Sequence, residues 1–386
     1  MNSQEYLDAM KDIQENILNF LEGGDRADEN FIILESKFYD INIKDYLYEL
    51  LSLLHLIAKI GNNHHRSHDF FSKIEKILLI FEEDIKKYIP NSEIFNIFKR
   101  NKKILLFLIE QQIIVFNEYI IRKITTTKKY IKDKYPQYFQ PEIQPFINEK
   151  WFPKKNGWVK EIKKELPNNF HKKRKEGEND SQICELIRND MIAEFLAFIT
   201  RNNVSLNAKI QPSIYETNLF LLKKDGGFSL IEYAVFFGSI QIFNYLRLEG
   251  VELTSSLWPF AIHGQNAEII HFLEDNNVEL DDNSCKQIFY ESIKCHHNDI
   301  ANYFINNFLQ SYVEDSQDTF NRCLKYYNFH FLKKEFISES QLCNLCKFDH
   351  YALVDILLKD NEIDVNKKGI FDILLIKFQL KDYSIM

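Results

Sequence analysis

Four residues near the C-terminal end of the sequence carry the side chains that zinc prefers. Cys343 and Cys346 form a Cys-x-x-Cys pair, and Cys323 and His330 precede them within a span of 24 residues. Thiolates and imidazoles are the usual ligands of tetrahedral zinc. The pair falls, however, where a helix is expected, between leucines and without the Gly or Pro of a metal-binding loop. Because free cysteine often packs as a small buried apolar residue, we favour a structural role for these thiols.

Histidines gather at two further places. Residues 63–69, Asn-His-His-Arg-Ser-His-Asp, could bind a transition metal, but they lack the His-Glu-x-x-His spacing that puts ligands on one helical face. We expect a solvated loop between two helices. Residues 295–297, Cys-His-His, could pair a nucleophile with a base, but adjacent helical residues project in different directions. We expect His297 to hold a turn instead.

Other catalytic patterns are missing. The sequence has no phosphate-binding glycine loop, no Gly-x-Ser-x-Gly turn and no kinase signature, and only 11 glycines are present to build one. We therefore expect a protein that is not an enzyme, with no catalytic residues, no cofactor and no bound metal.

Positive charge is concentrated in the middle of the chain. Residues 122–175 contain 16 Lys and Arg against 5 Asp and Glu, a formal +11 in a chain whose net charge is −8. The segment ends in a basic patch formed by Lys172, Lys173, Arg174 and Lys175. This patch could be a nuclear-import signal or could contact phosphates, so nucleic-acid or anionic-surface binding is the alternative function.

Helical spacing of apolar residues organises the first third of the chain. Phe (33) and Tyr (19) are abundant, whereas Gly (11) and Pro (8) are scarce, which favours long helices. The spacing predicts helices over residues 3–21, 31–39, 46–61, 74–89 and 92–121. Prolines then interrupt the pattern up to residue 180, and the stretch HKKRKEGENDSQ at the end of this part is expected to be disordered.

The second half contains an internal repeat. Residues 230–253, LIEYAVFFGSIQIFNYLRLEGVEL, are matched 27 residues later by LWPFAIHGQNAEIIHFLEDNNVEL. Ala234 aligns with Ala261, and the alignment places Trp258 at a core position. Weaker copies lie around residues 187–206, 292–304, 323–336 and 345–366. A recurring period indicates a stacked array in which neighbouring helix pairs share a core.

The register of these copies resembles the ankyrin repeat. The segment SLIEYA stands where ankyrin repeats have Thr-Pro-Leu-His-x-Ala, Gly238 falls at the turn between the helices, and Gly-Val-Glu-Leu at 250–253 replaces the ending Gly-Ala-Asp-Val. The phrases SLIEYAVFFGSIQIFNYL and ESIKCHHNDIANY also resemble a large, lineage-expanded family of uncharacterised protist proteins that join a helical N-terminal region to divergent ankyrin-type repeats. The Thr-Pro opening is missing, and periods of 27 and 31 fall short of the usual 33. The resemblance implies an interaction scaffold without an enzymatic activity.

We therefore expect an all-α protein. It would consist of a helical N-terminal module (1–125), a basic Pro-containing linker (126–180), an ankyrin-type α-solenoid of about five helix pairs (181–370) and a C-terminal tail or cap (371–386). The expected function is noncatalytic binding of a protein partner through the repeat face. The expected contact residues are Glu252, Thr254, His263, Glu279, Asp281 and Asp282. Their acidity predicts a basic partner.

The sequence also suggests a compartment. The N-terminus is acidic and polar, which is unlike a secretory signal, and no apolar stretch reaches the ~18 residues of a membrane span. With six cysteines and no export signal, we expect reduced thiols and a cytoplasmic location, with the nucleus as the alternative.

Overall fold

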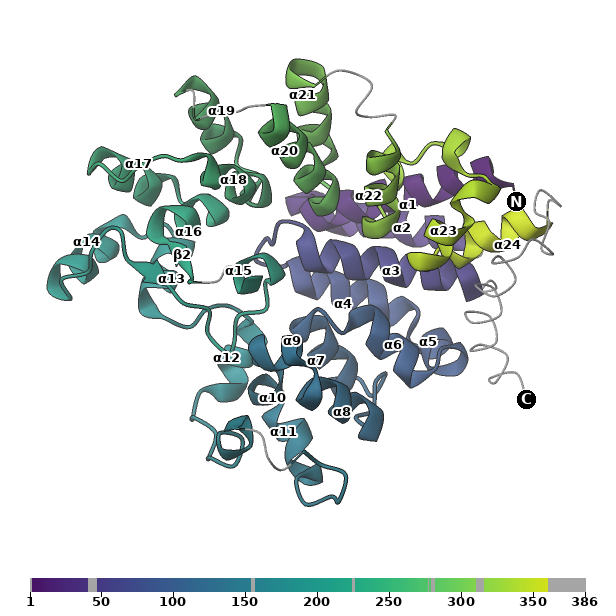
Figure 1. Ribbon diagram of the computed structural model, residues 1–386, viewed down its shortest axis with the longest axis horizontal. Helices are drawn as coiled ribbons and strands as arrows, with labels where there is room; N and C mark the ends of the chain where they lie inside the picture. Colours follow the sequence, from purple (N-terminus) through teal and green to yellow (C-terminus); the bar gives the residue numbers. More distant parts are fainter. Residues whose placement is uncertain are drawn as a thin grey trace. The chain divides into compact units, whose positions relative to one another are not determined.

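The fold is described from a computed structural model that covers residues 2–40, 47–153, 157–223, 226–276, 278, 282–309 and 316–359. In these residues nearly all regular structure is α-helix (Figure 1). The sheet they contain has two strands, β1 (Lys209–Ile210) and β2 (Phe228–Ser229), paired antiparallel. The prediction of a mostly helical protein is therefore confirmed for the part of the chain that the structure describes.

The chain divides into two compact units. Unit 1 combines Met1–Pro90 with Asp281–Met386, and unit 2 is Asn91–Leu280. Segments from the two ends of the sequence thus build one unit together. The predicted domain boundaries at residues 125 and 180 both fall inside unit 2, and those domains remain a prediction.

Unit 1 packs helices from the start of the chain against helices from its end. Its α-helices are α1 (Ser3–Glu22), α2 (Ala27–Asp40), α3 (Leu47–Asn63), α4 (Phe70–Ile80), α5 (Glu82–Tyr88), α20 (Asp282–Cys295), α21 (Asn298–Phe308), α22 (Gln317–Tyr326), α23 (Leu342–Lys347) and α24 (Tyr351–Lys359). Helix α1 contacts α24 and the short helix η7 (Phe329–Phe331), and α3 contacts α20 and α24. Figure 1 shows purple α1 beside these yellow-green C-terminal helices.

The first helix shows how the sequence sets this packing. Asn2 and Glu5 form a capping box, since each side chain accepts the backbone N–H of the other, at 3.0 and 2.9 Å. The helix then buries a stripe of apolar side chains at helical spacing, which includes Tyr6, Met10, Ile13, Ile17 and Leu21. Tyr6 of this stripe meets Phe329 of η7 edge to face, with ring centroids 6.3 Å apart.

The long helix predicted over residues 92–121 is wrong in its length. The segment forms three helices, α6 (Asn91–Phe98), α7 (Lys102–Glu110) and α8 (Glu118–Thr126). Asn101 accepts the N–H groups of Lys103 and Ile104 and so starts α7. Asn117 accepts the N–H of Ile120 and starts α8. The apolar spacing continues across these breaks, but asparagine caps begin new helices within it.

Unit 2 continues with shorter helices and then with helix pairs. The remaining helices are α9 (Lys128–Lys132), α10 (Tyr135–Tyr138), α11 (Gln140–Ile143), α12 (Phe170–Glu176), α13 (Gln182–Arg188), α14 (Ile192–Arg201), α15 (Leu219–Lys223), α16 (Leu230–Phe237), α17 (Ile240–Leu248), α18 (Trp258–Gly264) and α19 (Ala267–Asp275). Helix α16 packs against α13 and α18, and α14 packs against α17. Figure 1 shows the teal and green pairs α13–α14, α16–α17 and α18–α19 in succession.

The same helix–turn–helix connection recurs in both units. In the described residues, the turns between consecutive helices include six that pass through a residue with positive φ, namely Asp190, Gly238, Gln265, His296, Tyr327 and Asp349. After five of them the next N–H bonds to the carbonyl five residues back, at 2.9–3.0 Å, in the pairs Met191–Leu186, Ser239–Ala234, His297–Ser292, Asn328–Cys323 and His350–Leu345. This is the hydrogen bond of the Schellman turn. Two of the acceptors, Ala234 and Ser292, are positions that the sequence register aligns, both through Ala261.

The core of the helix pairs in unit 2 is tightly packed. Ala234 on α16 and Ala261 on α18 are fully buried, and Trp258 is 1% exposed, with its indole N–H donating to the Val278 carbonyl at 3.1 Å. The core position predicted for Trp258 is confirmed. Gly264 lies where α18 approaches the backbone of α16. A side chain therefore has no room at this position.

We predict that Gly264→Ala destabilises unit 2 although it adds a helix-forming residue. An added Cβ would lie 2.6 Å from the Val235 carbonyl oxygen and 2.9 Å from that of Phe236, and backbone atoms cannot swing aside. Overpacking of this kind costs about 1–3 kcal/mol. Urea unfolding followed by circular dichroism measures the loss, and Gly264→Val should lose more than Gly264→Ala. An unchanged midpoint for both variants would contradict this packing.

Candidate interaction surface

The loop after α17 brings two of the predicted contact residues to the surface. The side chains of Glu252 and Thr254 are exposed. The hydroxyl of Thr254 lies 2.8 Å from that of Ser256, which donates to Glu232 at 3.1 Å. Glu232 also forms the capping box of α16 with Ser229. The loop is thus hydrogen-bonded to the start of α16, and it presents the carboxylate of Glu252 to solvent.

His263 was predicted at an exposed position, and this prediction is wrong. Its side chain is only 2% exposed. The ring centroid lies 4.1 Å from that of Phe220 and 5.7 Å from that of Phe236. His263 projects from the face of α18 that packs onto aromatic side chains of unit 2, and spacing within one helix could not identify that face. It is a core residue.

The other predicted acidic contacts cannot be placed. Glu279 and Asp281 lie outside the described residues, and Asp282 begins α20 but its side chain is not described. Of the six predicted contact residues, Glu252 and Thr254 are therefore the two that the structure places at the surface.

The basic patch lies on helix α12, which corrects the expected disorder. Arg174 is 4% exposed, and its Nη1 donates to both carboxylate oxygens of Glu142 at 2.8 and 2.9 Å. Phe170 is buried on the same helix, and Gly177 ends it in the left-handed conformation with φ +73°. Burial of one aromatic and one paired arginine orders this segment, although its composition is that of a flexible linker.

The three lysines of the patch also have carboxylate partners. Lys172 lies 3.8 Å from Glu176, Lys173 lies 2.8 Å from Asp180, and Lys175 lies 3.6 Å from Glu110. The side chains of Lys172 and Lys175 remain 80% and 66% exposed. Exposed pairs of this kind contribute little to stability, but they compensate much of the local positive charge.

The four potential zinc ligands have separate surroundings. Cys343 is exposed on α23, whereas Cys323 and Cys346 are buried. In the part of unit 1 that the structure describes, they form no common ligand set with His330, whose ring lies 3.4 Å from Glu15. Burial also raises the pKa of the Cys323 thiol, so that side chain stays protonated and packs as an apolar group.

The histidine-rich segment after α3 was predicted to be a solvated loop, and only its tip is one. His64 is 2% exposed. Its Nδ1 lies 2.8 Å from the Cys295 carbonyl oxygen, and its Nε2 lies 3.0 Å from Glu22. His68 and the residues on either side of it are exposed. The segment therefore links α1 to the turn after α20, and the contact between His64 and Cys295 joins residues more than 200 positions apart.

The Cys-His-His sequence at 295–297 is part of the same contact. His297 directly follows the turn, at the start of α21, and its Nε2 accepts the N–H of His65 at 3.4 Å. His296 is left-handed with φ +61°, and burial lowers its pKa to about 3. Its Nε2 faces the Tyr327 carbonyl oxygen at 3.4 Å, so these histidines pack and hold the turn.

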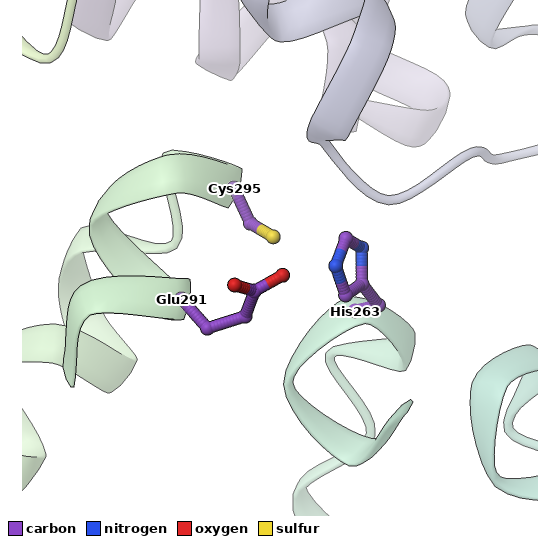
Figure 2. Close-up of side chains that lie close together, drawn as sticks. All are labelled: His263, Glu291 and Cys295. Carbon is purple, nitrogen blue, oxygen red and sulfur yellow. The ribbon is translucent and has the colours of Figure 1, made fainter. Parts of the chain in front are cut away.

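Helix α20 carries one further pair of ligand-type side chains. Figure 2 shows Glu291 and Cys295 one turn apart, with both side chains on the same side of the helix. Glu291 forms an ion pair with Lys294, and Cys295 is buried. His263, drawn in the same figure, belongs to unit 2 and is the core residue described above. Two side chains on one helix do not make the closed ligand set of a structural metal site.

A buried histidine cluster, which sequence reasoning missed, lies where the two segments of unit 1 meet. It consists of His55, His64, His296, His297 and His350, all less than 9% exposed. The Tyr327 ring stacks on His55 at 5.0 Å and on His350 at 4.1 Å. Burial lowers the pKa of His350 to about 4.

Amide side chains strengthen the same junction. Asn328 is fully buried, accepts from Gln14 at 3.1 Å and donates to the Ile293 carbonyl at 3.0 Å. Gln14 in turn accepts the Phe329 N–H at 2.7 Å. Because both partners are buried, loss of either would leave an unsatisfied polar group.

A groove lies between the second helices of two neighbouring pairs in unit 2. Its volume is about 350 Å³, and Phe243 from α17 and Phe272 from α19 form its apolar wall. Glu268 and Asp275, both exposed, line it on α19. We considered these helices only as part of the core and did not predict a groove. The sequence signal for it is the spacing of seven residues between Glu268 and Asp275, which puts the two carboxylates on one face of a helix.

Comparisons with known proteins gave no relatives: no family model matches the chain, and neither curated proteins nor solved structures do. Among the residues that the structure describes, none belongs to a helix that is both long and apolar enough to cross a bilayer.

Proposed function

We propose that the protein is a noncatalytic protein-binding protein that holds its partner with ankyrin-type helix pairs. The observation that carries the proposal is the recurring turn, with its left-handed residue and its backbone hydrogen bond to the carbonyl five residues back. First helices also pack on first helices, with α16 against α13 and α18 in unit 2, and α22 against α20 and α23 in unit 1. Arrays of this kind bind other macromolecules through exposed loops and helix faces.

The proposed contact surface includes the loop tip at Glu252 and Thr254, which is exposed and carries a carboxylate. In ankyrin-type arrays the corresponding loops and first helices form the binding face, and the sequence register predicts the acidic residues 279, 281 and 282 in another such loop. Such a surface favours a basic protein partner, held by complementary shape and a few buried anchors.

The alternative, binding of nucleic acid or an anionic surface through residues 122–175, has less support. Each lysine or arginine side chain of the patch at 172–175 has a carboxylate within 4 Å, and Arg174 is buried. Phosphate binding depends on lysine and arginine side chains that can replace the counterions of the phosphates. In the patch, Lys172 and Lys175 are the side chains that remain exposed enough for that role.

Reversing the charge of the proposed face tests the proposal. We expect Glu252→Lys, Glu279→Lys and Asp281→Lys together to weaken affinity for a captured partner about tenfold, because like charges would then oppose each other. The partner is captured with the intact chain, identified by mass spectrometry and titrated against both proteins. Thermal melting of the triple variant should match that of the parent. Equal affinity of the parent and the triple variant for the partner would contradict the proposed binding face.

A further inference from the structure

We propose that the groove between α17 and α19 binds a cationic helical segment of a protein partner. The segment would place two basic side chains against Glu268 and Asp275 and an apolar side chain between them. This site lies on second helices, apart from the loop tips proposed above. It rests on two helices of unit 2 and does not depend on the ankyrin-type assignment.

The spacing of the two carboxylates sets the length of the ligand. Glu268 and Asp275 are seven residues apart on α19, which corresponds to about 10 Å along the helix axis. Both side chains are exposed, and neither forms an ion pair with another described residue. His271 and Phe272 lie between them along the same wall. A ligand that satisfies both carboxylates must therefore run along α19.

The apolar wall between the carboxylates is held in place from behind. The rings of Phe243 and Phe272 meet edge to face, with centroids 5.4 Å apart. The guanidinium of Arg247 lies 4.6 Å from the Phe272 ring and donates to Asn244 at 2.8 Å. Phe243 is 2% exposed, whereas Phe272 is half-buried and keeps a free surface. A fixed aromatic surface of this kind can accept an apolar anchor at a low entropic cost.

Charge determines which ligand fits. From residue 240 to 276 the chain has one base, Arg247, against five carboxylates, at 249, 252, 268, 274 and 275, a formal −4. An acidic ligand would be repelled at both ends of the groove, whereas a basic one would be attracted. The groove lies between two helices, a shape into which a third helix fits with anchors at i, i+3, i+4 and i+7. Two lysines or arginines seven residues apart match this pattern.

The test uses the intact protein and a synthetic peptide. The probe is a fluorescein-labelled helical peptide with two lysines seven residues apart and leucines between them, and its counterpart carries glutamates at the two lysine positions. Fluorescence anisotropy at low salt should show saturable one-to-one binding of the lysine peptide. Glu268→Lys with Asp275→Lys should weaken this binding about tenfold. The control, Glu185→Lys with Glu194→Lys, makes the same charge change at exposed positions outside the groove and should leave the affinity within about twofold.

Three results would overturn the proposal: no saturable binding of the lysine peptide, equal binding of the glutamate peptide, or equal loss of affinity in the groove variant and the control variant. All variants change exposed side chains, so melting curves that match the parent show that each is folded. A negative result in this peptide test leaves the loop-tip proposal intact, because that proposal depends on Glu252 and on a different partner surface.

Discussion

Deleting residues 1–90 is expected to unfold residues 282–359 as well, although the two segments are separated by nearly 200 residues. The helices of the C-terminal segment share one core with α1 and α3, and no second core is left to replace it. In a 91–386 chain, amide hydrogen exchange should show residues 282–359 unprotected. The helices of unit 2 should keep the protection that they have in the intact protein.

The size of this effect follows from what the deletion exposes. Asn328 loses Gln14, Tyr327 loses the stacking of His55, and the Cys295 carbonyl loses His64. Each buried polar group left without a partner costs about 1–3 kcal/mol, before the lost apolar contacts are counted. Separately expressed residues 1–90, added back, should restore the protection. Full protection of residues 282–359 in the shortened chain would disprove the division into these two units.

Acidification from pH 7 to pH 4 is expected to destabilise unit 1. Burial lowers the pKa of His296 to about 3 and that of His350 to about 4, whereas histidine in the unfolded chain titrates near 6.5. Below pH 6.5 the unfolded chain binds protons that the folded unit excludes. The stability contributed by the neutral rings is therefore present above pH 6.5 and is lost as the pH falls toward 4. One pKa unit is worth about 1.4 kcal/mol, so the loss is on the order of a few kcal/mol.

Urea unfolding at several pH values measures this loss, and one variant isolates the histidine. His350→Leu lowers stability at pH 7, because the ring no longer bonds the Leu324 carbonyl, but it should flatten the decline between pH 7 and pH 4. The matched control is His271→Leu at an exposed position, which should keep the parental slope. If His350→Leu and the parent declined in parallel, the buried histidine would not be the cause.

Local sequence signals predicted local structure well. Apolar spacing identified α1 and α3, and the internal repeat aligned Ala234 with Ser292 through Ala261. Ala234 and Ser292 both accept the backbone hydrogen bond of the recurring turn. These features depend on neighbours within one or two helices. The break of the predicted 92–121 helix was also visible locally, since Asn101 and Asn117 are typical cap residues.

What the sequence did not reveal depends on contacts between distant segments. Nothing in the composition of residues 63–69 shows that His64 is buried against Cys295, because polar segments are usually solvated. The basic patch looked disordered, yet Arg174 is paired with Glu142 from 32 residues away. The exposure of His263 was misjudged for the same reason. Burial is decided by the packing partner, and the partner is not adjacent in sequence.

The affinity of the captured partner for three forms of the intact chain tests the central proposal most directly. The forms are the parent, the acidic-face variant at residues 252, 279 and 281, and Lys172→Glu with Lys175→Glu. Calorimetry at low and high salt should show weaker binding in the acidic-face variant and unchanged binding in the lysine variant. The opposite pattern, with binding lost only in the lysine variant and falling steeply with salt, would contradict protein binding through the helix pairs and would favour an anionic partner.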